Sequence, residues 1–140
     1  ARQVNNRVVA HVVSRVRGLL EERNKPLQKA RVLVLGVTFK EDCPDLRNSR
    51  GLDLVQMLAA AGAQVDAFDP WADPRSAHDM GDVELVKAPK RGVYDAVVLA
   101  VAHQQFRAFD EAQIRALGVP DMVVYDVKSA WPRQLVDDRL

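Results

Sequence analysis

Hydrophobic positions along the chain follow two periods, one typical of helices and one typical of buried strands. From Arg2 to Glu22, a valine or leucine recurs at every fourth position, which predicts a long amphipathic helix. The pattern returns from Ser49 to Ala61, where Asn48 or Ser49 can cap the helix start and Gly62 can end it. We therefore expect two helices that each bury one face.

Five short apolar runs predict strands. They span residues 31–37, 64–68, 83–86, 94–102 and 122–127. The first and fourth are continuously apolar, as strands covered on both faces are. Further segments separate the strands: residues 71–81 are irregular or weakly helical, Asp110 caps a helix at 109–117, and Pro132 begins a tail with a short helix. We expect an α/β fold, a Rossmann-like doubly wound parallel sheet of five strands, preceded by a long connector helix.

The connection from the first strand to the next helix, residues 38–47, is the predicted functional site. Such connections usually take about 2–6 residues, so this one is long, and it contains two cations and three acids. Open α/β sheets bind ligands outside the carboxyl ends of their strands. Both its length and its charge therefore point to ligand binding.

Four segments in order resemble one protein family. Residues 36–49, GVTFKEDCPDLRNS, resemble the G-x-x-F-K-x-x-x-x-D-x-R-x-S segment of the UDP-glucose/GDP-mannose dehydrogenases, which are nucleotide-sugar 6-dehydrogenases. The resemblance continues in AQVDAFDPWAD (63–73), YDAVVLAVAHQQF (94–106) and VVYDVKSA (123–130). The first segment is most similar to bacterial enzymes that oxidise UDP-N-acetylhexosamines for surface polysaccharides such as capsule and O-antigen.

This resemblance implies a domain organisation and a strand order. Residues 30–140 would be the C-terminal nucleotide-sugar-binding domain, and residues 1–29 a connector helix and linker from a middle domain. The strand order, numbered along the chain, would be 3-2-1-4-5. Because the chain starts within a predicted helix, we expect it to be a fragment of a longer, homo-oligomeric enzyme whose N-terminal and middle domains lie outside it.

The resemblance also implies binding roles for individual residues. Lys40 matches the lysine that contacts the nucleotide-sugar, and a compact cation suits a pyrophosphate. Lys128 matches a basic position near the same substrate. Arg47 matches an arginine that reaches the NAD held by another domain, with Asp45 either holding it or capping the next helix. His103 ends a central strand, where it either meets the ligand or is satisfied by backbone groups.

Catalysis is not expected from this chain alone. A dinucleotide domain needs G-x-G-x-x-G at its first turn, but no glycine follows Gly36 until Gly51. Asp69 occupies the position of the acid that binds the ribose in a dinucleotide domain, but an Asp-Pro pair such as Asp69-Pro70 is also an ordinary start of a turn. The family nucleophile, a cysteine, belongs to a middle-domain segment that this sequence lacks. Cys43 precedes a proline without a paired histidine and is expected to be a structural thiol.

Composition limits the partners and the compartment. Twenty lysines and arginines balance 19 acids, so there is no general attraction toward nucleic acid or a membrane surface. No apolar run approaches the length that membrane insertion needs. The single cysteine cannot form an internal disulfide, and arginines interrupt the first apolar face, against a signal peptide. We therefore expect a cytoplasmic protein that binds a UDP-sugar and NAD, without nucleic acid or membrane insertion.

Two other classes of function compete with this interpretation. A signalling receiver domain shares the five-stranded fold, and Asp42, Asp45 and Lys128 imitate its acidic cluster and lysine. A receiver also needs an acceptor aspartate after the third strand, and the run at 83–86 leads into Lys-Ala-Pro-Lys instead. A free-standing nucleotide-binding module without a catalytic partner is the third class.

Overall fold

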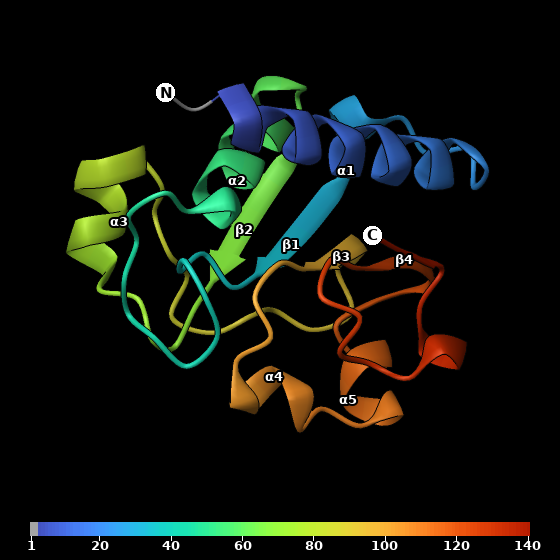
Figure 1. The fold of residues 1–140 in the computed structure, drawn as a ribbon. Coiled ribbons are helices and arrows are strands. Elements are labelled where there is room, and N and C mark those ends of the chain that lie inside the picture. The colour runs from blue at the N-terminus through green and yellow to red at the C-terminus, as the bar shows by residue number, and fades with distance from the viewer. Residues whose placement is uncertain (1–2) are drawn as a thin grey trace.

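A parallel sheet between two layers of helices forms the centre of the computed structural model, which describes residues 3–140 with side chains from Arg7 onward (Figure 1). The strands lie in the order β2-β1-β3-β4-β5, and every pair is parallel. This confirms the expected α/β fold and its five-stranded parallel sheet. The strands are β1 (Arg31–Leu35), β2 (Gln64–Phe68), β3 (Tyr94–Leu99), β4 (Gly118–Asp126) and β5 (Asp138–Arg139).

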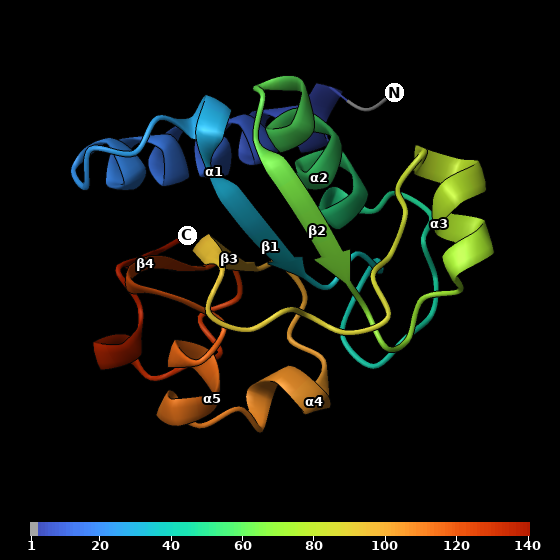
Figure 2. The same ribbon diagram turned by 180° about the vertical axis from the view of Figure 1, so that it is seen from behind.

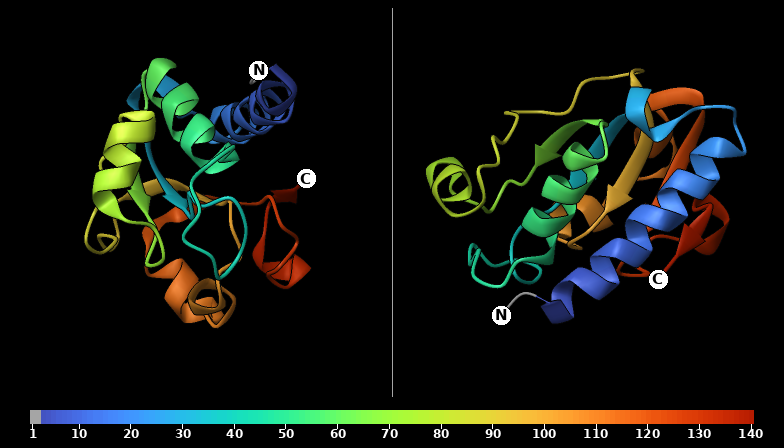
Figure 3. Two further views of the ribbon diagram at one scale, coloured as in Figure 1. Left: turned by 60° about the vertical axis from the view of Figure 1, so that its left-hand side comes forward. Right: turned by 90° about the horizontal axis from the view of Figure 1, so that it is seen from above.

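The helices are divided between the two faces of the sheet. Helices α1 and α2 cover one face, α4 and α5 lie against the other, and α3 lies beyond the β2 edge (Figures 1 and 2). The left-hand view of Figure 3 also separates these layers. The helices are α1 (Gln3–Glu21), α2 (Arg50–Ala60), α3 (Pro74–Gly81), α4 (Gln104–Arg107) and α5 (Glu111–Arg115), with 3₁₀ turns η1 (Leu27–Lys29) and η2 (Arg133–Leu135).

Successive side chains of the central strands alternate between two hydrophobic cores, one on each face of the sheet. In β1, Val32 and Val34 pack with the valines of α1 and the leucines of α2, whereas Leu33 and Leu35 pack on the opposite side. That second core contains Phe106 and the side chains of α5 and the C-terminal tail. This confirms that the first strand is covered on both faces. Each fully buried valine or leucine contributes roughly 1.5–3 kcal/mol.

Two strand predictions need correction. Residues 83–86 do not form a strand: they make one bridge, Ala67 to Leu85, before the chain bends away at Lys87. The fifth strand is instead β5, which pairs with the end of β4. Two polar residues show no apolar period, so sequence could not reveal this strand. The order of the other four strands is as expected.

Helix α1 belongs to the same folded unit as the sheet. Its buried apolar side chains join the core that α2 and the central strands share; they are Val9, Val12, Val13, Val16, Leu19 and Leu20. The helix was expected from Arg2 to Glu22; it is observed from Gln3 to Glu21, and Arg2 lies outside the described residues. That residues 1–29 also connect to a middle domain stays a prediction. No helix in the described part of the chain combines the length and apolar character needed to cross a membrane.

Candidate functional site

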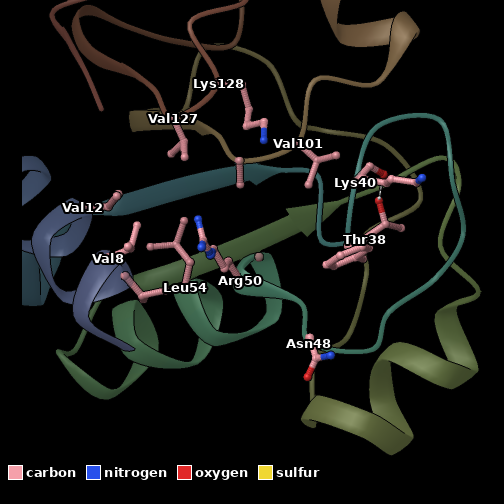
Figure 4. Close-up of a pocket in the computed structure, with 14 residues that line it drawn as sticks. Val8, Val12, Thr38, Lys40, Asn48, Arg50, Leu54, Val101, Val127 and Lys128 are labelled. Atoms are coloured by element: carbon pink, nitrogen blue, oxygen red, sulfur yellow. Dashed lines mark hydrogen bonds between the residues drawn. The ribbon is translucent and has the colours of Figure 1, made fainter. Parts of the chain in front are cut away.

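A pocket of about 290 Å³ opens at the carboxyl ends of β1, β3 and β4. The loop after β1 forms one wall, the start of α2 forms the floor, and the N-terminal half of α1 closes the far side (Figure 4). The structure thus places a pocket where the sequence predicted one. Its lining residues are Val8, Val9, Val12, Thr38, Phe39, Lys40, Asn48, Arg50, Gly51, Leu54, Ala100, Val101, Val127 and Lys128.

Of the pocket residues that the structure describes, three are cations and none is an acid. Lys40 comes from the loop after β1, Arg50 from the first turn of α2 and Lys128 from the segment after β4. In Figure 4, Arg50 and Lys128 extend from opposite sides toward the space between them. Among the described side chains, none of the three cationic groups is engaged in an ion pair. Uncompensated cations around one cavity favour a polyanionic ligand such as a pyrophosphate.

The rest of the pocket lining is mostly apolar. Val8 and Val12 of α1 lie beside Leu54 of α2, and Val101 and Val127 lie near Lys128 at the strand ends (Figure 4). A cavity with a few polar groups on an otherwise apolar lining is the usual form of a small-molecule site. The pocket is therefore suited to a ligand with a charged part and a less polar part.

Asp69, at the end of β2, fixes the backbone where β1 ends. Its Oδ2 accepts the backbone N–H groups of Val37 at 2.7 Å and Thr38 at 3.2 Å, and its Oδ1 accepts those of Trp71 and Ala72. Burial acts to raise the pKa of this carboxyl, but the hydrogen bonds from His103 and Val37 outweigh it and hold the pKa below its usual value. Asp69 is thus a buried anchor for two loops, in keeping with its expected turn role.

His103 lies beneath the loop and outside the pocket. Its ring is fully buried, with Nε2 2.9 Å from Asp69 Oδ2, and Nδ1 accepts the backbone N–H of Asp42 at 2.9 Å. The two ring nitrogens therefore already have partners within the protein. Of the two sequence-based alternatives, this geometry favours a histidine satisfied by the protein over one that contacts a ligand.

Arg47 also lies outside the pocket. Its side chain is 80% exposed and forms an ion pair with Asp45. Arg47 Nη2 lies 2.8 Å from Asp45 Oδ2, and Arg47 Nε lies 3.1 Å from Asp45 Oδ1. The Arg47 guanidinium lowers the pKa of Asp45 to about 2. Asp45 thus holds Arg47 and does not cap α2. Lys40 and Lys128 share one pocket, whereas Arg47 and His103 are placed elsewhere.

The start of α2 packs closely against the end of β1. Ser49 is the N-cap: its Oγ accepts the Leu52 N–H at 3.0 Å and donates to the Val37 carbonyl oxygen. Gly51 lies so close that an added Cβ would be 2.6 Å from Val37 Cα. Because Ser49 and Asp69 occupy the N–H groups that a dinucleotide pyrophosphate would need, this turn does not fit the phosphate-binding turn of a dinucleotide domain.

The other reactive groups that the structure describes do not gather into a second site. Cys43 is a free, partly exposed thiol in the loop. Across residues 3–140, no three histidine, cysteine or acidic side chains group closely enough to hold a metal ion.

Sequence reasoning missed two polar pocket residues, Asn48 and Arg50. Both stand at the start of a predicted helix, where the periodic pattern does not show which way a side chain points. A usable signal was present for Arg50, because a cation in the first turn of a helix opposes the helix dipole and so points to a role other than helix stability.

A doubly wound parallel sheet with a cationic pocket at its strand ends defines a nucleotide-binding α/β domain. The sequence profile of the UDP-glucose/GDP-mannose dehydrogenase family, UDP-binding domain, matches residues 33–133. The chain belongs to this family. This decides between the sequence-based classes in favour of the dehydrogenase domain and against the receiver domain.

Named relatives and solved structures agree with this assignment. The chain is 41% identical over 140 residues to a UDP-N-acetyl-D-glucosamine 6-dehydrogenase of Pseudomonas aeruginosa and 35% identical over 139 residues to that of Salmonella typhi. Each match covers 99% of this chain and 33% of the relative, so the chain spans about a third of their length. The structure of a UDP-glucose dehydrogenase from Pyrobaculum islandicum matches 95% of the chain and 30% of its own, with a TM-score of 0.69 and 28% identity. A UDP-D-ManNAc dehydrogenase from Pyrococcus horikoshii, at 23% identity, shares the fold with a TM-score of 0.77 over 98% of this chain and 31% of its own.

Proposed function

We propose that this chain is the C-terminal nucleotide-sugar-binding domain of an NAD-dependent 6-dehydrogenase that oxidises the C6 alcohol of a UDP-N-acetylhexosamine to a carboxylate. The observation that carries the proposal is the pocket lined by Lys40, Arg50 and Lys128 without any acid. A UDP-sugar has a doubly charged pyrophosphate, which these cations would hold. The apolar side between α1 and α2 would take an uncharged part of the ligand.

The rest of the enzyme would supply the chemistry. A pocket of about 290 Å³ is at the small end of ligand sites, which span about 300–1,000 Å³, so another domain would complete it. NAD would be bound mainly by an N-terminal domain, because the turn after β1 does not fit a dinucleotide. Arg47, exposed and outside the pocket, would reach that NAD across the cleft. The enzyme would be a cytoplasmic homo-oligomer that acts in the synthesis of capsule or O-antigen polysaccharide.

Calorimetric titration of the 140-residue chain with UDP, UDP-N-acetylglucosamine and GDP tests the binding part of the proposal. We expect the uridine ligands to bind and Lys128→Met to weaken them by roughly 10-fold, the effect of one charge-assisted contact. Lys29→Met is the control, since Lys29 is an exposed lysine before β1, at the other end of that strand from the pocket. Equal affinities for both variants would remove the pocket from the binding site.

The catalytic part is tested on the full-length protein. NADH formation from UDP-N-acetylhexosamine and NAD by the full-length protein, but not by the 140-residue chain, supports the proposal. NADH formation by the pure 140-residue chain would contradict it. A full-length protein that binds UDP-sugars without oxidising them would be the free-standing nucleotide-binding module.

A further inference from the structure

The loop segment that contains Lys40, residues 38–42, is in hydrogen-bond contact with His103 at both of its ends. Before Lys40, Thr38 Oγ1 lies 3.1 Å from His103 Nε2, and after it the Asp42 N–H donates to His103 Nδ1 at 2.9 Å. The Thr38 hydroxyl in turn donates to the Lys40 carbonyl oxygen at 3.0 Å. The backbone of Lys40 is therefore held in place, although its side chain is exposed.

These contacts define the tautomer of the imidazole. Because Nδ1 accepts the Asp42 N–H, it has a free lone pair, and the proton of the neutral ring is on Nε2. That N–H points to the Asp69 carboxylate, whose Oδ2 lies 2.9 Å away. The ring is completely buried and packs against Phe106 and Trp71. The Nε2 side of His103 thus faces Asp69 and Thr38, at the ends of β2 and β1, and its Nδ1 side holds the loop through Asp42.

The charged groups around His103 come from three elements. Asp69 faces it from the end of β2. The Asp42 carboxylate, on the loop, accepts the Gln104 N–H at 2.8 Å and lies 3.4 Å from Nη2 of Arg107 in α4. Asp42 has a positive φ of 56°, a conformation that costs energy for a residue with a side chain and needs support from its surroundings. The bond to Nδ1 provides part of that support.

We propose that His103 is a positioning residue for nucleotide-sugar binding: its Nδ1 holds Asp42 and thereby keeps Lys40 at the pocket. This inference rests on the proposed function. Loss of the Nδ1 acceptor alone is therefore expected to loosen the loop, while the hydrogen bond to Asp69 leaves the sheet beneath it folded.

Two substitutions in the full-length enzyme separate the two bonds. In His103→Asn, the amide oxygen takes the place of Nδ1 and keeps the acceptor for Asp42. In His103→Gln, the longer amide reaches Asp69 as Nε2 does and leaves the Asp42 N–H without an acceptor. We expect the glutamine variant to raise KM for UDP-N-acetylglucosamine by about 3- to 10-fold, the effect of one lost hydrogen bond, with kcat and KM for NAD changed by less than about 2-fold. The asparagine variant should stay near wild type.

The asparagine variant provides a second readout, because it keeps the acceptor for Asp42 and loses the hydrogen bond to Asp69. If His103→Gln does not fold, this variant decides: a folded His103→Asn enzyme whose KM for the UDP-sugar rises by about 10-fold or more overturns the inference. Lower thermal stability in both variants with an unchanged KM would also overturn it, since His103 would then only support folding. A wild-type enzyme that neither binds nor oxidises UDP-sugars would instead overturn the proposed function.

Discussion

Gly51→Ala should damage both the fold and the pocket, because the start of α2 leaves no room for a side chain. An alanine Cβ would lie 2.6 Å from Val37 Cα and 2.7 Å from the Gly36 carbonyl oxygen. Both neighbours are backbone atoms, so no side-chain rotation can relieve the contact. Ordinary van der Waals contact begins near 3.4 Å, which means that α2 must move away from β1 by most of an ångström.

The cost follows from this displacement. Overpacking a well-packed core typically lowers the free energy of unfolding by about 1–3 kcal/mol. The higher helix propensity of alanine offsets at most about 1 kcal/mol of this loss. We therefore expect a net loss of about 1–2 kcal/mol in the free energy of unfolding. Because Arg50 and Leu54 line the pocket from the same helix, the affinity for UDP should fall as well.

Urea unfolding of the 140-residue chain, followed by circular dichroism, measures this loss through the shift of the midpoint. The control is Gly18→Ala in α1, where an added Cβ meets nothing within 4 Å. It should stabilise the chain by about 0.5–1 kcal/mol, the ordinary gain from replacing a helical glycine. A Gly51→Ala chain as stable as the Gly18→Ala control, with unchanged UDP affinity, would refute the close approach of α2 to β1.

Three further predictions concern the loop after β1. In the full-length enzyme, Lys40→Ala should raise KM for the UDP-sugar by roughly 10-fold, whereas Arg47→Ala should raise KM for NAD more than KM for the UDP-sugar. Steady-state kinetics with each substrate varied in turn measures both effects. Equal effects of one variant on both KM values would indicate that the loop simply collapses. The Asp45 carboxyl should titrate near pH 2 by NMR and move toward its ordinary pKa in the Arg47→Ala chain. Because this pKa is lowered, the pair should stabilise the fold above the ordinary pKa, near 3.8, and lose that effect as the pH falls toward 2. Cys43→Ser should retain most activity, and a loss of several orders of magnitude in a folded enzyme would identify Cys43 as a nucleophile.

Sequence predicted the parts of the site that depend on local pattern. The buried run that ends at Gly36 and the long charged connection after it located the ligand-binding edge of the sheet. The family resemblance assigned Lys40 and Lys128 to the same substrate, and the structure places them at one pocket because the carboxyl ends of parallel strands meet at the same edge. The long first helix was also predictable, because its valines repeat over several turns.

The rest of the site depends on contacts between residues far apart in the chain. His103 stands at a strand end, as expected, but only the positions of Asp42 and Asp69 show that its ring turns away from the pocket. The apolar side of the pocket could not be predicted either. It requires the N-terminal half of α1 to lie beside the start of α2, and no local pattern gives that relation.

The position of α1 links the pocket to the core. Val9 and Val12 line the pocket and are also buried in the core shared with α2 and the sheet. At the other end of the helix, Arg15 pairs with Asp138 at 2.7 Å, and Arg23, just beyond it, pairs with Asp137 at 3.0 Å. Exposed or partly exposed pairs of this kind contribute little to stability, so they orient the helix more than they stabilise it. Because the same valines hold the helix on the sheet and form the pocket wall, displacing α1 from the sheet would open the pocket and expose the core together.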